Sequence, residues 1–120
     1  LLVNEVEGAF LAGTEDPEEI ARVLTARYPA TMLVLTLGTQ GSLAAMGEMR
    51  VRMPARTVKA VDTTAAGDTF TGYFLRGVLD ERSLEESLGL AAAASALAVT
   101  REGAADAVPA YDEAEAFYRS

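Results

Sequence analysis

The chain has no cysteine and no histidine among its 120 residues. The absence of cysteine excludes disulfide bonds and thiolate metal sites, and it fits a reducing compartment. The absence of histidine excludes Ser-His-Asp hydrolases, Cys-His nucleophiles and histidine-ligated zinc. Three large classes of catalytic site are therefore ruled out before any motif is considered.

Positive charge is also scarce, since ten Lys and Arg residues stand against 18 Asp and Glu residues and the net charge is -8. A nucleic-acid surface needs clustered Lys and Arg, and the ten here are scattered, so we expect no nucleic-acid partner. A small phosphorylated ligand is compatible with this charge, because helix dipoles and Mg²⁺ act locally against the average field.

Long apolar runs are absent as well. The longest candidate, Leu90 to Val99, is rich in alanine and interrupted by Ser95, and it falls short of the roughly 18 residues that cross a bilayer. Neither end has the pattern of a secretory signal. We therefore expect no membrane partner and a cytoplasmic location.

The hydrophobic pattern predicts an α/β fold in a single domain, residues 1–120. Half of the residues are hydrophobic, which is enough for a core in a chain of this length. Short apolar runs predict strands at 1–3, 31–37, 42–46, 49–53 and 58–61. Helical spacing predicts helices at 5–12, 66–79, 84–99 and 109–118, and another that starts near Pro17 with Thr14 as N-cap and stops at Pro29. Asp112, Glu113 and Glu115 are interpreted as an exposed helix face rather than a metal cluster.

The stretch from Val61 to Phe70 carries most of the functional information. It reads Val-Asp-Thr-Thr-Ala-Ala-Gly-Asp-Thr-Phe, with small residues between two aspartates where a strand is expected to give way to a helix. Small residues let backbone N–H groups approach an anion, and a helix N-terminus adds about half a positive charge. We predict that a phosphate binds there and that Asp68 takes a proton from an attacking hydroxyl. The alternative is a plain turn in which Asp68 caps the helix.

Two shorter motifs precede this stretch. Asn4 and Glu7 form an Asn-x-x-Glu pattern, which fits a capping box at a helix start and also oxygen ligands near Mg²⁺. Thr36, Gly38 and Gly41 form a Thr-x-Gly-x-x-Gly pattern after an apolar run, which is typical of a strand, a tight turn and a second strand. Each of these motifs alone has a purely structural explanation.

In this order and spacing the three motifs resemble those of the ribokinase-like, or PfkB-type, carbohydrate kinases. Residues 62–70 are similar to the family signature D-T-T-G-A-G-D-x-F, with Ala65 in place of its first Gly, as is frequent in ribokinases. The resemblance implies a three-layer αβα ribokinase-like fold, of which this chain is the C-terminal portion. It also implies that Asp68 is the catalytic base and that the backbone N–H groups of Ala65, Ala66 and Gly67 form an anion hole.

The resemblance further implies which residues lie beside ATP. Those residues are Asn4 and Glu7 near Mg²⁺ and phosphate through ordered water, Thr36, Gly38 and Gly41 under the nucleotide, and Ala92 next to the adenine. Many family members carry Asn or His near the last of these positions, so a polar contact to the adenine is expected to be missing in this chain.

A monovalent cation, taken as K⁺, is implied by resemblance alone. Its ligands would be the Asp62 carboxylate and a set of backbone carbonyls. Carbonyl dipoles can replace the hydration shell of a large, weakly hydrated ion. The carbonyls are those of Thr64, Ala98, Arg101, Gly103 and Ala107.

The function that the resemblance implies is an ATP-dependent sugar kinase, which transfers the γ-phosphoryl group to a sugar hydroxyl. Kinases for fructose, a nucleoside or a sugar acid are alternatives within the family. A noncatalytic nucleotide-binding module is an alternative outside it. A Rossmann dinucleotide module is disfavoured, because no G-x-G-x-x-G follows a strand.

Members of this family are longer than the chain and carry a sugar-binding part and a lid ahead of the matched region. We therefore expect this chain to be a fragment with negligible kinase activity of its own. We also expect it to form homo-oligomers or to associate with the missing N-terminal half, because an incomplete sheet exposes strand edges or an apolar face.

Overall fold

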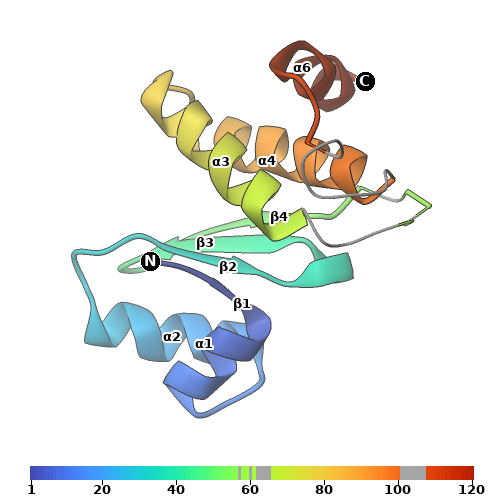
Figure 1. Cartoon of the computed structure of the whole chain (residues 1–120). Coiled ribbons are helices and arrows are strands. Elements are labelled where there is room, and N and C mark those ends of the chain that lie inside the picture. Colours follow the sequence, from blue (N-terminus) through green and yellow to red (C-terminus); the bar gives the residue numbers. More distant parts are fainter. Residues whose placement is uncertain (57, 60, 62–65, 101–107) are drawn as a thin grey trace. The chain divides into compact units, whose positions relative to one another are not determined.

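The computed structural model describes residues 1–56, 58, 59, 61, 66–100 and 108–120. The chain divides into two compact units, Leu1–Pro54 and Ala55–Ser120, and each is considered by itself. Figure 1 labels the helices and strands of both units along the chain. No helix in the described ranges is long and apolar enough to cross a membrane.

The first unit is built on a four-stranded sheet in the order β1-β2-β3-β4. Strand β1 (Leu2–Asn4) pairs with β2 (Leu33–Thr36) in parallel, whereas β3 (Ser42–Met46) and β4 (Met49–Met53) continue the sheet in antiparallel fashion. Gly47, at a φ of 58°, makes the tight turn between the last two strands. The parallel pair is joined by a crossover of two helices, as parallel strands require.

Both crossover helices, α1 (Glu5–Ala12) and α2 (Pro17–Arg27), lie on the same face of the sheet (Figure 1). Ile20 and Leu24 of α2 are fully buried with Leu35 and Leu43 of the strands in one core cluster. A Cβ on Gly8 of α1 would lie 2.9 Å from Leu35 Cδ1, so a larger residue there would require the Leu35 side chain to shift.

Local chemistry sets the ends of these two helices. Asn4 caps α1, and Gly13, in the left-handed conformation with a φ of 76°, ends it, both as predicted. The N-cap of α2 is Asp16, whose Oδ1 accepts from the N–H of Glu18, so the prediction of Thr14 as the cap was wrong. The Thr14 hydroxyl instead accepts a hydrogen bond from the N–H of Asp16, the residue directly before the helix.

The described part of the second unit contains helices α3 (Ala66–Leu79), α4 (Leu84–Val99) and α6 (Tyr111–Arg119), and α4 packs against both others. Two close approaches hold them together. A Cβ on Gly77 of α3 would lie 2.6 Å from Ser87 Oγ, and one on Gly89 of α4 would lie 2.4 Å from Tyr118 Cε1. Small residues at these two crossings are therefore required by packing.

Four expected elements need correction, the first being β1, which covers Leu2–Asn4 rather than the predicted 1–3. The strand predicted at 58–61 is not present at its described residues, Val58, Lys59 and Val61. Strand β2 covers only Leu33–Thr36 of the predicted 31–37, and α6 begins at Tyr111 rather than at Pro109. Pro109 stands two residues before the helix, and Ala110 is the N-cap.

Candidate functional site

In the first unit the fold brings the two short motifs to one edge of the sheet. Asn4 and Thr36 are the last residues of the parallel strands β1 and β2, and they are register partners. The carboxyl ends of parallel strands are where α/β folds place their ligands. Two residues that lie 32 positions apart in the sequence are therefore neighbours at this edge.

Asn4 and Glu7 form the predicted capping box. The Asn4 Oδ1 accepts from the Glu7 N–H at 2.8 Å, and the Glu7 Oε1 accepts from the Asn4 N–H at 3.0 Å. Both residues are exposed, and each uses one oxygen in the cap. The remaining Glu7 oxygen has no assigned partner in the described part of the chain, and an exposed carboxylate oxygen suits the water shell of Mg²⁺.

The glycine motif forms a sharp turn between β2 and β3. Gly38 has a φ of 58° and Gly41 a φ of 92° with a ψ of -135°, conformations that favour glycine. The Leu37 N–H donates to the Gly41 carbonyl at 2.8 Å and closes the turn. A Cβ on Gly38 would lie 3.8 Å from Glu5 Oε1, which puts this turn beside the start of α1.

In the second unit the predicted base stands in the first turn of α3. Asp68 and Gly67 are exposed and Ala66 is half-buried. Apart from its chain neighbours and its own helix, no described atom lies within 4 Å of a Cβ placed on Gly67, so this side of the residue is open. No described residue accepts a hydrogen bond from the N–H of Ala66 or Gly67, and no described residue donates one to the Asp68 carboxylate. Ala65, the third predicted anion-hole residue, lies outside the described residues.

Helix α4 contacts the start of α3 and the segment before it. The Ser95 hydroxyl donates to the Ala66 carbonyl at 3.2 Å, and the Val61 N–H donates to the Val99 carbonyl at 2.6 Å. The second bond joins Val61 to the last residue of α4, whereas Asp62, the predicted cation ligand that follows Val61, lies outside the described residues. Ala92, the predicted adenine neighbour, is half-buried on α4.

Ala98 is the one predicted cation ligand that the structure describes. Its side chain is fully buried, and its carbonyl accepts from the N–H of Thr100. A carbonyl oxygen has a second lone pair, so this bond leaves room for a cation. The other predicted ligands, Asp62, Thr64, Arg101, Gly103 and Ala107, lie outside the described residues. No group of three or more His, Cys, Asp or Glu side chains in the described ranges could hold a metal ion.

A depression of about 320 Å³ lies next to Asp68 in the same unit. Tyr73 and Tyr111 stack in its wall with ring centroids 6.2 Å apart, and the Tyr73 hydroxyl donates to the Pro109 carbonyl at 2.6 Å. Burial raises the pKa of Tyr73, which keeps it a donor at neutral pH. The lining residues are Asp68, Thr69, Gly72, Tyr73, Arg76, Val108 and Tyr111.

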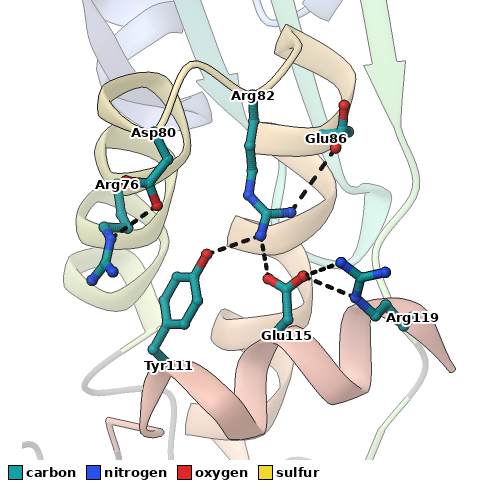
Figure 2. Close-up of polar contacts among 7 residues, drawn as sticks. All are labelled: Arg76, Asp80, Arg82, Glu86, Tyr111, Glu115 and Arg119. Carbon is teal, nitrogen blue, oxygen red and sulfur yellow. Dashed lines mark hydrogen bonds and ion pairs between the residues drawn. The ribbon is translucent and has the colours of Figure 1, made fainter.

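A charged cluster that the sequence did not predict ties α6 to the other helices (Figure 2). The Arg82 guanidinium donates to the Tyr111 hydroxyl at 2.9 Å and to the Glu115 carboxylate, and its nearest approach to Glu86 is 4.0 Å. Arg119 pairs with the same Glu115 at 2.8 Å. Glu115 is only 18% exposed, so its assignment to an exposed acidic face was wrong. The sequence signals for the cluster were two i,i+4 spacings, that of Arg82 and Glu86 and that of Glu115 and Arg119.

The cluster fixes the charges of its members. Burial raises the pKa of Glu115, but the hydrogen bond from Arg119 and the charge and hydrogen bond of Arg82 outweigh it, so this pKa lies below its ordinary value. The hydrogen bond to Tyr111 is the largest of the effects that raise the pKa of Arg82. Both groups are therefore ionised at neutral pH, and the pair anchors α6.

Comparison with known proteins relates the chain to one family. The family described as pfkB family carbohydrate kinase matches residues 1–111. The ribokinase of Haemophilus influenzae is 36% identical over 115 residues, which make up 92% of this chain and 37% of that protein. The chain thus spans well under half the length of this relative.

Solved structures are similar over the full chain. The structure of Arabidopsis thaliana ribokinase complexed with ribose and ATP matches with a TM-score of 0.92 and 32% identity, over 100% of this chain and 40% of that one. A fructokinase variant from Vibrio cholerae O395, in a form with fructose, ADP and potassium ion bound, matches with a TM-score of 0.87 and 30% identity, over 98% of this chain and 39% of that one. The α/β, ribokinase-like fold class expected from the sequence is confirmed.

Proposed function

The chain belongs to the pfkB family of carbohydrate kinases, and on this premise we propose that it is the C-terminal, nucleotide-binding and catalytic portion of an ATP-dependent sugar kinase. The reaction would transfer the γ-phosphoryl group of ATP to a sugar hydroxyl. Ribose is the first candidate acceptor, because the signature of this chain is closest to that of ribokinases. Fructose is the second, since fructokinases stand among its relatives at 38% identity.

The chemistry assigned to the second unit is proton removal and charge stabilisation. The Asp68 carboxylate would accept the proton of the attacking hydroxyl while that oxygen bonds to the γ-phosphorus and the bond to the β-phosphate oxygen breaks, releasing ADP. The N–H groups of Ala65, Ala66 and Gly67 would stabilise the charge on the transferred group. One donor of such a hole is typically worth about 3 kcal/mol.

The roles assigned to the first unit concern the nucleotide. Thr36, Gly38 and Gly41 would line the floor under it. Mg²⁺, when bound, neutralises the charge of the β and γ phosphates. Asn4 and Glu7 fit the water shell of this ion because both are exposed, oxygen-bearing residues, one at the end of strand β1 and the other in the first turn of α1.

The observation that carries the proposal is the state of the first turn of α3. A buried or paired Asp68 could not serve as a base, and a hydrogen-bonded loop could not receive a phosphoryl group. Within the described residues, the Asp68 carboxylate is exposed and has no hydrogen-bond partner. The N–H groups of Ala66 and Gly67 beside it donate to no described residue. This arrangement supports phosphoryl transfer over a helix cap.

The test is replacement of Asp68 by asparagine in the full-length protein, with ADP release measured on ribose and on fructose. Loss of a general base lowers turnover by about 10²- to 10⁴-fold, while ATP affinity should change little. Asp80→Asn is the matched control, because Asp80 is an exposed carboxylate at the other end of the same helix. Turnover of the Asp68→Asn variant within tenfold of the parent would remove Asp68 from the role of base.

A monovalent cation site, for K⁺, is part of the proposal. The Val61–Val99 hydrogen bond supports it, because it joins Val61, the residue before Asp62 in the sequence, to the end of α4, where the carbonyl of Ala98 lies. Turnover compared in potassium and in tetramethylammonium salts tests it, and equal rates would count against the site. Association with the remaining part of the kinase or with a second copy, and a cytoplasmic location, stay predictions.

A further inference from the structure

Ser95, in the middle of α4, donates its hydrogen bond to a different helix. A Ser or Thr inside a helix often returns its hydroxyl to the carbonyl four residues earlier, as Thr71 does to Gly67 at 3.0 Å. The half-buried Ser95 instead donates to the carbonyl of Ala66, the first residue of α3, at 3.2 Å. This bond ties the start of α3 to a helix that is buried along most of its length.

The Ala66 carbonyl and the Gly67 N–H belong to the same peptide group. A trans peptide is planar, and its C=O and N–H point in opposite directions. A donor that holds the carbonyl therefore also sets the direction of the N–H, and hydrogen bonds that follow one another in a chain polarise each other. The Gly67 N–H donates to no described residue, so it is available to a ligand.

The bond from Ser95 adds to what the helix provides. Within α3 the Ala66 carbonyl is the acceptor for the N–H four residues further on, and a carbonyl oxygen has a second lone pair for the Ser95 hydroxyl. Helix ends fray, and Ala66 is an end residue. A second bond at this residue therefore restrains the part of α3 that has the fewest restraints of its own.

We propose that Ser95 is a positioning residue for phosphoryl transfer, whose hydroxyl orients and polarises the Ala66–Gly67 peptide so that the Gly67 N–H points at the transferred group. The inference rests on the proposed function and adds a residue of α4 to it. Donors held in place where charge develops act mainly on the transition state. The effect of Ser95 is therefore expected in turnover rather than in affinity for ATP.

Replacement of Ser95 by alanine in the full-length protein is the first test. Alanine is the best helix former, so α4 is retained. Loss of one neutral hydrogen bond should lower kcat about three- to tenfold and leave the KM for ATP within about twofold of the parent. Ser87→Ala is the matched control, because the Ser87 hydroxyl lies on the same helix, is fully buried and has no partner among the described residues. Ser95→Thr keeps the hydroxyl and should restore kcat to within about twofold.

A second measurement does not depend on turnover. Binding of ADP to the same proteins is compared by calorimetry with and without aluminium fluoride, which mimics the phosphoryl group in transfer, in the presence of Mg²⁺ and ribose. The fluoride should strengthen ADP binding in the parent and in Ser87→Ala. In Ser95→Ala this gain should be about three- to tenfold smaller, while binding of ADP alone is unchanged.

Turnover of Ser95→Ala equal to that of Ser87→Ala would overturn the role of Ser95. Equal weakening of ADP binding with and without the fluoride would also overturn it, because Ser95 would then support only the fold. A parent protein that phosphorylates no sugar would refute the proposed function. The fluoride measurement would still report on Ser95 in that protein, so the two failures can be told apart.

Discussion

Arg82 is the residue whose loss should loosen the helical unit most among its charged residues. It connects the turn after α3 to two residues of α6, Tyr111 and Glu115 (Figure 2). Glu115 has a second partner in Arg119. Two arginines thus pair with one carboxylate. Replacing each arginine by methionine in turn compares the stability contributed by a buried partner, Arg82, with that contributed by an exposed one, Arg119.

The size of the effect follows from burial. Removing one partner of a buried ion pair costs about 3–5 kcal/mol, whereas an exposed pair contributes about 0–1 kcal/mol. The side chains of Arg82 and Glu115 are 16% and 18% exposed, and that of Arg119 is 71% exposed. Because Glu115 keeps Arg119 when Arg82 is lost, we expect Arg82→Met to cost about 2 kcal/mol and Arg119→Met less than about 1 kcal/mol.

Urea unfolding followed by tyrosine fluorescence is a suitable assay. The chain has no tryptophan, and Tyr73, Tyr111 and Tyr118, three of its four tyrosines, lie in the helical unit. A loss of about 2 kcal/mol moves the urea midpoint by about 1 M at an m-value near 2 kcal/mol/M. Equal losses for Arg82→Met and Arg119→Met would refute the reasoning, since burial would then not decide the strength of the pair.

Three further predictions concern the same unit. Gly77→Ala should destabilise it, because the new Cβ would lie 2.9 Å from Ser87 Cα and overpacking costs about 1–3 kcal/mol. Gly72→Ala should stabilise α3 by up to about 1 kcal/mol in the same urea assay, because no described atom outside its own helix lies within 4 Å of the new Cβ. Glu81 has a φ of 59°, so Glu81→Gly should raise the free energy of unfolding by about 0.5 kcal/mol, and a similar gain from Glu81→Ala would contradict the backbone explanation. The pKa of Glu115 is lower in the folded chain than its unfolded value of 4.5. The stability that this carboxylate contributes is therefore complete above pH 4.5 and is lost as pH falls through the folded pKa. Between pH 6 and pH 3 the free energy of unfolding should depend less on pH in Glu115→Gln than in the parent, and an unchanged slope would count against this explanation.

Much of the secondary structure was predictable because its signals are local. Helices 5–12, 66–79 and 84–99 and strands 42–46 and 49–53 begin and end at the predicted residues. Capping residues, glycines and short apolar runs act over a few positions, so they can be read without the fold. Thr14 was a wrong N-cap for a related reason, because Asp16 is also a capping residue and stands directly before Pro17, at the first position of the helix.

The strand predicted at 58–61 shows where local signals fail. Val58 and Val61 favour an extended chain, but a strand exists only when another strand pairs with it. The same limit applies to Glu115, whose acidic neighbours predicted an exposed face. Its burial depends on Arg82, which lies 33 residues earlier in the chain.

By itself the sequence determined the family of this protein and the residues that carry its motifs, because a motif is a set of residue types at fixed spacing along the chain. Only the tertiary structure decided that Asn4 and Thr36 end neighbouring strands, that Arg82 holds Glu115, and that Ser95 donates to the Ala66 carbonyl. The physical reason is that pairing between strands, burial of charge and packing of helices depend on contacts between residues far apart in the chain.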